Sequence, residues 1–324
     1  MSHPLASGII SAPVLPFAEN GAIDWAMLDR YIVQVAAGKP QAIAMNMAVS
    51  EVSSLEIAEQ LEVIRRCKAV LAGSCTLLSG LSVTHTVAAR EHSKRLVDAG
   101  AEGIVAFPPV PAFLGGATVE MIEDWHRAIA EAIDVPILAF QTPFSPYPKG
   151  AITALSGIPS IVSIKDASFN VDQTLANVEE AAAAPRRIGV LTGSDTFILE
   201  AMLMGCDGAL IGFAATATAA LVSMQAFAQQ GKVTEAYEIW NQLGPLVRVC
   251  WRQPLRDYRV RTKYVLMRQG VLPNMVVRSP FPKLHPQDQA DIDKLFNQYD
   301  LMNPRFLPAG RATADGSGGA RSAR

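Results

Sequence analysis

A lysine at the end of a short apolar run has the clearest chemical potential in this sequence. Ile161, Val162 and Ile164 form a β-branched run typical of a strand buried on both faces, and Lys165 ends it before a polar turn. A lysine amine that is removed from water loses its proton more readily, and the neutral amine can attack a carbonyl carbon to form a Schiff base. This stretch alone also allows a strand-end lysine that pairs with Asp166 or extends to water.

The segments that must position this lysine alternate between strand-like and helix-like patterns. Strands are expected at residues 8–14, 42–47, 70–75, 103–107, 135–141, 161–165, 188–192 and 209–212. Eight such units with continuously apolar strands predict an α/β fold, a (β/α)8 TIM barrel over residues 1–230. A doubly wound open sheet is the second choice, because no Gly-x-Gly-x-x-Gly follows the first strand. In a barrel, Lys165 lies at the carboxyl end of a strand, where active sites of this architecture are found.

The segments between and after these strands also carry recognisable signals. A capping box of Ser53 and Glu56 is expected to open the helix after the second strand, and Asp195 is expected to cap the helix after the seventh. Residues 231–302 predict three further helices, a C-terminal helical extension, from apolar side chains at helical intervals. Residues 303–324 are rich in Gly, Ser, Ala and Arg and predict a disordered tail.

Composition argues against several functional classes. The 324 residues carry a formal net charge of −2 without a basic block, so nucleic acid is not an expected partner. No apolar run reaches the ~18 residues that span a bilayer, and the sequence begins without a leader pattern, so we expect a cytoplasmic protein without a membrane partner. Isolated cysteines and the absence of Cys/His spacing predict reduced thiols and no metal site. The histidines at 85, 92 and 126 are expected on solvated helix faces.

Several segments, in their order and spacing, resemble the dihydrodipicolinate synthase and N-acetylneuraminate lyase superfamily of class I aldolases. They are the segments 13–17, 21–24, 49–56, 100–103, 136–143, 161–166, 193–195 and 205–208. The resemblance covers about residues 8–300. It implies that Lys165 condenses with the ketone of pyruvate or another 2-keto acid, with no metal and no organic cofactor. It also implies a homodimer or homotetramer.

The site that the resemblance implies departs from the family pattern. Phe140 stands where the family has a proton-carrying tyrosine at the end of strand five, and it has no hydroxyl. Val110 occupies the position of a second tyrosine, and residues 144–149 contain no counterpart of the arginine that binds the aldehyde substrate in lysine biosynthesis. The implied substrate-binding residues are Ala48, Val49, Ser50, Gln141, Thr142, Gly193 and Leu210. Ala48 and Val49 replace the family's hydroxyl residues, although backbone N–H groups of that turn could still hold a carboxylate.

Three functions remain open at this point. The first is a Schiff-base lyase, of the aldolase or hydratase/dehydratase type, with another proton carrier such as a water held by polar side chains near the lysine. The candidates for holding that water are Gln141, Thr142, Ser163 and Ser168. The second is a binding or regulatory protein that keeps a pocket for a keto acid or sugar acid without turnover. The third is a scaffold in which Lys165 is a structural ion pair. Dihydrodipicolinate synthesis itself is not expected, because its proton carriers and its arginine are replaced.

Overall fold

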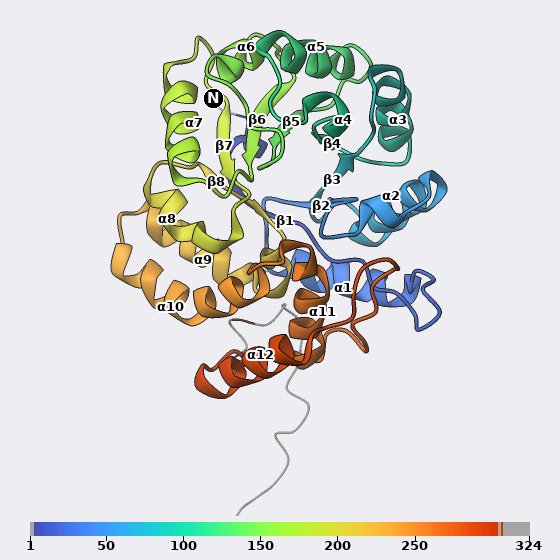
Figure 1. Ribbon diagram of the computed structural model, residues 1–324, viewed down its shortest axis with the longest axis vertical. Coiled ribbons are helices and arrows are strands. Elements are labelled where there is room, and N and C mark those ends of the chain that lie inside the picture. The colour runs from blue at the N-terminus through green and yellow to red at the C-terminus, as the bar shows by residue number, and fades with distance from the viewer. Residues whose placement is uncertain (1–2, 304–305, 307–324) are drawn as a thin grey trace, which may run out of the picture.

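Eight parallel strands form a closed barrel in the computed structural model, which describes residues 3–303 and 306 (Figure 1). Each strand pairs with the next, and β8 pairs with β1 to close the ring. The strands are β1 Gly8–Ser11, β2 Ala42–Met45, β3 Thr76–Leu81, β4 Gly103–Ala106, β5 Ile137–Gln141, β6 Ile161–Asp166, β7 Gly189–Thr192 and β8 Gly208–Ile211. Nearly all of their residues are buried, as the apolar runs predicted. The predicted (β/α)8 barrel is therefore confirmed.

Helices surround the barrel and continue beyond it. The barrel helices are α1 Trp25–Ala37, α2 Ile57–Leu71, α3 Thr86–Asp98, α4 Val110–Phe113, α5 Val119–Ala130, α6 Ala151–Ser156, α7 Val171–Ala183, α8 Ile198–Leu203 and α9 Thr218–Gln229. The extension consists of α10 Val233–Cys250, α11 Tyr258–Arg268 and α12 Pro286–Gln298. In Figure 1 these three helices lie together below the strands, with α10 packed against α9 and α12 against α10. The predicted helical extension is confirmed.

The predicted third strand was placed too early. Residues 70–71 still belong to α2, which ends where Ala72 and Gly73 adopt left-handed backbone conformations, with φ values of 46° and 83°. The strand itself contains Ser79 and Gly80, which interrupt its apolar run. Gly80 is required there, because a Cβ atom at this position would lie 2.2 Å from the carbonyl oxygen of Asn46 on the neighbouring segment.

Two predicted helix starts also need correction. The capping box of α2 is formed by Glu56 and Glu59, whereas Ser53 belongs to a short 3-10 helix before it. Asp195 does not cap a helix with its side chain; its carboxylate accepts a hydrogen bond from the backbone N–H of Phe213, at 2.9 Å. Asp195 therefore joins the end of β7 to the end of β8, which places it at the mouth of the barrel.

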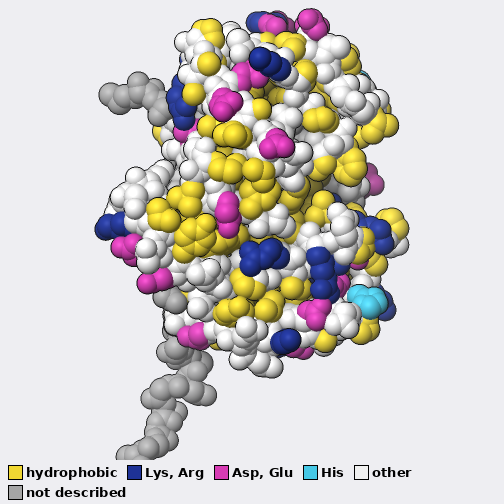
Figure 2. Space-filling model, turned by 60° about the vertical axis from the view of Figure 1, so that its left-hand side comes forward, with side chains coloured by type: hydrophobic (Ala, Val, Ile, Leu, Met, Phe, Trp, Pro, Cys, Tyr) yellow, Lys and Arg dark blue, Asp and Glu magenta, His cyan; other side chains and the backbone are white. Residues whose placement is uncertain are grey.

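The surface carries mixed charges (Figure 2), and most of the C-terminal tail lies outside the described residues. On the face drawn in Figure 2, Lys and Arg side chains are interspersed with Asp and Glu. Among the described residues no helix is long and apolar enough to cross a membrane. Apart from residues 303 and 306, the tail predicted for 303–324 lies outside the described part of the chain.

Candidate active site

The alternation of side chains along β6 separates the lysine from its neighbouring aspartate. Successive residues of a strand point to opposite faces, so Lys165 and Asp166 cannot face the same way. The carboxylate of Asp166 accepts hydrogen bonds from Gln141 Nε2 at 2.7 Å and from Thr174 Oγ1 at 2.5 Å, the latter on α7. Asp166 therefore fastens β6 to β5 and α7, and the alternative of a Lys165–Asp166 pair is wrong.

The amine of Lys165 is buried without a bonded partner. The side chain is 8% exposed, and its Nζ lies 4.2 Å from the centre of the Phe140 ring. Within residues 3–303 and 306, Nζ makes no hydrogen bond and no ion pair. Burial lowers the pKa of Lys165 to about 8, and the charge of Asp195 opposes this shift in part. At neutral pH the neutral, nucleophilic amine is therefore far more accessible than in a solvated lysine.

Lys165 lines a cavity of about 190 Å³ at the carboxyl ends of the strands. The cavity wall is mainly apolar and combines loops after six strands with the C-terminal extension. Its lining residues are Ala12, Met47, Ala48, Val49, Phe140, Thr142, Pro143, Phe144, Lys165, Ala167, Phe169, Gly193, Asp195, Gly212, Trp251, Leu255 and Tyr258. Trp251 and Tyr258 stack on each other with ring centres 5.2 Å apart. The extension therefore completes the pocket that the barrel begins.

The residues proposed from the sequence divide into two groups. Those that line the cavity are Lys165, Phe140, Ala48, Val49, Thr142 and Gly193. Ser50, Gln141 and Leu210 are buried behind it. The Ser50 hydroxyl donates to the carbonyl of Pro13 at 2.7 Å, and Gln141 spans Asp166 and the backbone N–H of Tyr147. Leu210 belongs to the core inside the barrel.

Gly193 controls how closely the loop after β7 approaches the lysine. A Cβ atom at position 193 would lie 2.7 Å from Lys165 Cε and 2.8 Å from the Cβ of Ala167. Glycine is therefore the residue that allows the Lys165 side chain to extend past this loop.

Asp195 is the second buried ionisable group of the cavity. It is 3% exposed, and no ion pair joins its carboxylate to Lys165 or to any other cation of the described residues. Burial raises the pKa of Asp195 to about 7, while the hydrogen bond from the Phe213 N–H and the charge of Lys165 lower it in part. Both groups are thus driven toward their neutral forms by desolvation. The sequence signal for Asp195 was present, since it follows Gly193 at a strand end, but it was interpreted as a helix cap.

Tyr258 adds a third ionisable group, and no local sequence pattern indicated it. Burial raises its pKa to about 12, and the nearby charge of Arg259 lowers it slightly. Arg259 lies beside this ring, with its guanidinium carbon 4.6 Å from the ring centre, and its Nε donates to the carbonyl of Ala48 at 2.7 Å. Helix α11 thus contacts the turn after β2 directly.

A buried ion pair fixes the same turn from behind. Glu51 is fully buried, and its carboxylate accepts a hydrogen bond from Lys263 Nζ at 2.6 Å and from the backbone N–H of Arg278 at 3.0 Å. Burial lowers the pKa of Lys263 to about 8, and Glu51 opposes that shift. Glu51 therefore anchors residues 48–50 to the extension.

Two histidines and Tyr147 make structural contacts and do not line the cavity. His126 is fully buried, with Nδ1 2.7 Å from the carbonyl of Ile122, and burial lowers its pKa to about 4. His92 is buried against Gln60, so neither histidine lies on the solvated face that was expected. The Tyr147 hydroxyl donates to the carbonyl of Phe140 at 3.3 Å and does not line the cavity. It therefore does not replace the missing tyrosine hydroxyl. Among the described residues no three His, Cys, Asp or Glu side chains form a group that could hold a metal ion.

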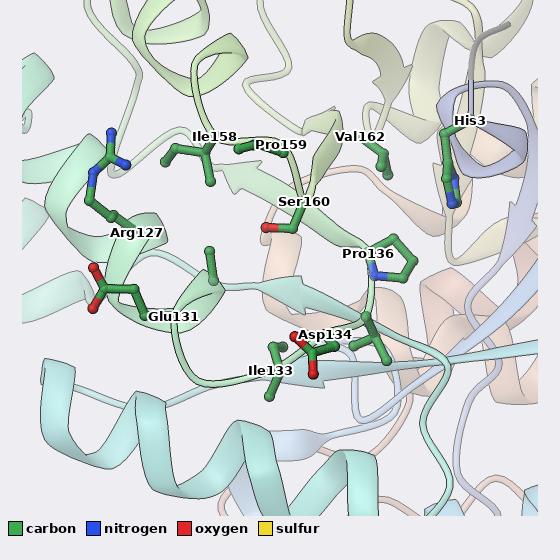
Figure 3. Close-up of a pocket in the computed structure, with 12 residues that line it drawn as sticks. His3, Arg127, Glu131, Ile133, Asp134, Pro136, Ile158, Pro159, Ser160 and Val162 are labelled. Carbon is green, nitrogen blue, oxygen red and sulfur yellow. The ribbon is translucent and has the colours of Figure 1, made fainter.

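A larger hollow of about 510 Å³ lies at the opposite end of the barrel (Figure 3). It is formed mainly by residues that precede β5 and β6, and Arg127 of α5 and Glu131 just after that helix stand at one side of it. The Arg127 guanidinium already pairs with Glu123. Because the buried amine of Lys165 lies at the other end of β6, the cavity around Lys165 is the candidate active site.

The fold and this cavity define a class of protein, a (β/α)8 barrel with a buried lysine at the end of its sixth strand. The chain belongs to the Dihydrodipicolinate synthetase family, whose sequence model matches residues 5–299. The family's members are class I lyases.

Individual relatives agree with this assignment. The chain is 28% identical to a 4-hydroxy-tetrahydrodipicolinate synthase of Prosthecochloris aestuarii over 276 residues, which cover 84% of this chain and 90% of the relative. It is 30% identical to the enzyme of that name from Chlorobium phaeovibrioides, over 77% of this chain and 83% of the relative.

Solved structures show the same fold. Dihydrodipicolinate synthase from Oceanobacillus iheyensis superposes with a TM-score of 0.82 at 20% identity, covering 92% of this chain and 98% of that one. The enzyme from Acinetobacter baumannii, solved in complex with pyruvate, superposes with a TM-score of 0.80 at 24% identity, covering 90% and 98%.

Proposed function

We propose that this protein is a Schiff-base-forming lyase that acts on pyruvate or another 2-keto acid through Lys165. One observation supports this most directly, namely a buried lysine that has no bonded partner among the described residues and lines a cavity at the catalytic end of the barrel. The amine attacks the keto carbon, water leaves, and the resulting iminium accepts electrons from a breaking bond at C3. The complex of the Acinetobacter baumannii relative with pyruvate supports the choice of ligand.

The turn after β2 is suited to the substrate carboxylate. The backbone N–H groups of Ala48, Val49 and Ser50 donate no hydrogen bond within residues 3–303 and 306. Ala48 and Val49 line the cavity together with Lys165. Consecutive N–H groups in a turn form a concave site for an anion, and this one needs no side-chain hydroxyl.

The remainder of the substrate is expected to differ from that of the named relatives. Phe140 replaces a proton-carrying tyrosine, and Val110 lies 45% exposed on α4, outside the residues that line the cavity. Apolar side chains such as Phe144, Phe169 and Trp251 also line the cavity. We therefore propose a 2-keto acid with an apolar distal part, and not the reaction of 4-hydroxy-tetrahydrodipicolinate synthase.

A keto-acid-binding protein without turnover is the second candidate. It is favoured because hydroxyl groups near Lys165 already form hydrogen bonds with other groups of the protein. Ser50 donates to Pro13, Thr142 shares a 2.8 Å hydrogen bond with Ser145, and Ser163 donates to Leu5 at the far end of β6. A protein of this kind would bind a keto acid without exchanging its C3 protons.

The test is reduction with borohydride in the presence of pyruvate, followed by intact-mass and peptide mass spectrometry. We expect a reduced pyruvate adduct on Lys165, no adduct in Lys165→Ala, and an undiminished adduct in Lys149→Ala, which removes an exposed lysine. An adduct that persists in folded Lys165→Ala would show that the lysine assignment is wrong. A cytoplasmic location and a homodimer or homotetramer stay predictions from the sequence.

A further inference from the structure

We propose that Asp195 is the catalytic acid–base of this site and carries the proton that Phe140 cannot. This inference rests on the proposed function, since it assigns a role within a Schiff-base reaction at Lys165. It begins from a chemical requirement. An enamine forms when a proton leaves C3, and a product forms when a proton returns there, so a lyase of this kind needs a proton carrier inside the pocket.

The hydrogen-bond partners of the neighbouring groups leave few candidates. Gln141 is held by Asp166 and the backbone of Tyr147, and Ser168 is held in the turn with Asn170. The Tyr147 hydroxyl is directed to the Phe140 carbonyl and to His126. The ionisable side chains of the cavity wall are Lys165, Asp195 and Tyr258.

The position of Asp195 meets the geometric requirement. C3 of a keto acid bound to Lys165 is separated from the lysine nitrogen by C2, so its proton carrier must lie across a gap from the amine. Asp195 and Lys165 line one cavity but form no ion pair in the described chain, which leaves such a gap between them. The Phe213 N–H holds the carboxylate at 2.9 Å, so its orientation is fixed before substrate arrives.

The electrostatic surroundings suit a group that gives and takes a proton near neutral pH. Burial raises the pKa of Asp195 to about 7, and the charged or titratable groups around it are Lys165 on β6, Cys250 on α10 and Tyr258 on α11. An acid–base works best when its pKa lies near the working pH. Burial raises the pKa of Tyr258 to about 12, so this hydroxyl is almost entirely protonated at neutral pH and cannot accept a proton there.

The proposed steps balance as follows for a 4-hydroxy-2-keto acid joined to Lys165 as the iminium. The Asp195 carboxylate takes the proton of the C4 hydroxyl, the C3–C4 bond breaks, and its electron pair forms the enamine while an aldehyde leaves. The protonated Asp195 then gives that proton to C3, which restores the iminium. Water adds to C2, and hydrolysis releases pyruvate and the free Lys165 amine.

The test uses pyruvate alone and follows exchange of its methyl protons with deuterium oxide by proton NMR. In the pyruvate iminium the Asp195 carboxylate takes a C3 proton and returns a deuteron. Asp195→Asn keeps an oxygen to accept the Phe213 N–H but cannot transfer a proton. We expect exchange to fall about 10²- to 10⁴-fold in this variant, the usual contribution of an acid–base, while borohydride still traps the adduct on Lys165.

Three further variants and a pH profile make the result decisive. Asp207→Asn is the matched control, because Asp207 accepts the Val190 N–H at the far end of the barrel, and it should retain wild-type exchange. Wild-type exchange should rise with pH through about 7, as Asp195 ionises, and Asp195→Glu should recover part of the activity. Loss of exchange in Tyr258→Phe with retention in Asp195→Asn would overturn the proposal. Loss of the adduct itself in Asp195→Asn would also overturn it, by showing that Asp195 acts only through Lys165.

The two proposals fail in different ways. If the wild-type protein forms no pyruvate adduct, the proposed function fails and this inference fails with it. If the adduct forms and Asp195→Asn exchanges at the wild-type rate, the Schiff-base function stands and Asp195 is not its acid–base.

Discussion

The buried pair of Glu51 and Lys263 allows a quantitative test of how the extension supports the pocket. Lys263 is 1% exposed, and besides Glu51 it donates to the carbonyl of Val276 at 2.6 Å and lies 4.4 Å from the centre of the Phe17 ring. Lys263→Met retains most of the apolar stem and removes the ammonium group. The carboxylate of Glu51 is then left in a fully buried position with only the Arg278 N–H from its previous partners.

The expected loss is large because a charge without its partner is buried. Removal of one member of a buried ion pair typically destabilises a protein by about 3–5 kcal/mol. The double variant Glu51→Gln with Lys263→Met removes both charges and keeps an acceptor for the Arg278 N–H, so it should lose clearly less than Lys263→Met alone. Lys263→Met should also need more pyruvate for half-maximal trapping at Lys165, because Glu51 directly follows the turn of residues 48–50.

Urea unfolding followed by circular dichroism, combined with the pyruvate trapping curve, measures both effects. Arg65→Met is the matched control, since Arg65 pairs with Glu62 on the surface and such exposed pairs contribute about 0–1 kcal/mol. If Lys263→Met destabilises the protein no more than Arg65→Met does, the argument from burial is refuted. If the trapping curve is unchanged in a strongly destabilised variant, the turn does not depend on this anchor.

Two shorter predictions concern the lysine itself. Gly193→Ala should reduce the rate of adduct formation at least about tenfold, because the added methyl group would overlap the Lys165 side chain and displace its amine. It should also lower the unfolding midpoint, because the methyl group would overlap the Cβ atom of Ala167, which moves only with its backbone. An unchanged trapping rate would contradict this steric argument. The rate of trapping at saturating pyruvate should rise with pH, with the midpoint of the rise near pH 8, because burial lowers the pKa of Lys165 from 10.5 to about 8 and only the neutral amine attacks. Quenched reactions from pH 6 to 10 measure this dependence. A midpoint near 10.5 would indicate a solvated lysine.

The sequence predicted the barrel and the lysine at the end of its sixth strand, because both rest on local patterns. Apolar runs and their alternation with amphipathic segments decide where strands form, and Lys165 terminates one of them. The third strand was misplaced because its Ser79 and Gly80 break that pattern for a reason of tertiary structure, the close approach of the Asn46 carbonyl. An apolar continuation of α2 was taken for the strand instead.

The rest of the site could not be predicted in this way because distant segments assemble it. Trp251 and Tyr258 come from the extension, about 85 to 95 residues after Lys165 in the chain, and only the tertiary structure brings them to the same cavity. Asp195 could be interpreted as a helix cap from sequence, since aspartate at a turn is usually a cap, and its hydrogen bond to Phe213 depends on the pairing of two loops. The buried positions of His92 and His126 likewise follow from packing between helices, which single-helix patterns do not reveal.

The contribution of the extension to the pocket has a consequence for the chain during its synthesis. Lys165 is translated well before Trp251 and Tyr258, and until those rings cover the barrel mouth its amine remains in contact with water. A hydrated amine keeps the ordinary lysine pKa and stays protonated, so a growing chain should not condense with the keto acids and aldehydes around it. If Lys165 is the proposed nucleophile, it should become active only when the last helices have folded onto the barrel. Ribosome-bound chains that end before α11 should therefore resist pyruvate trapping, which ties the onset of reactivity to the completion of folding.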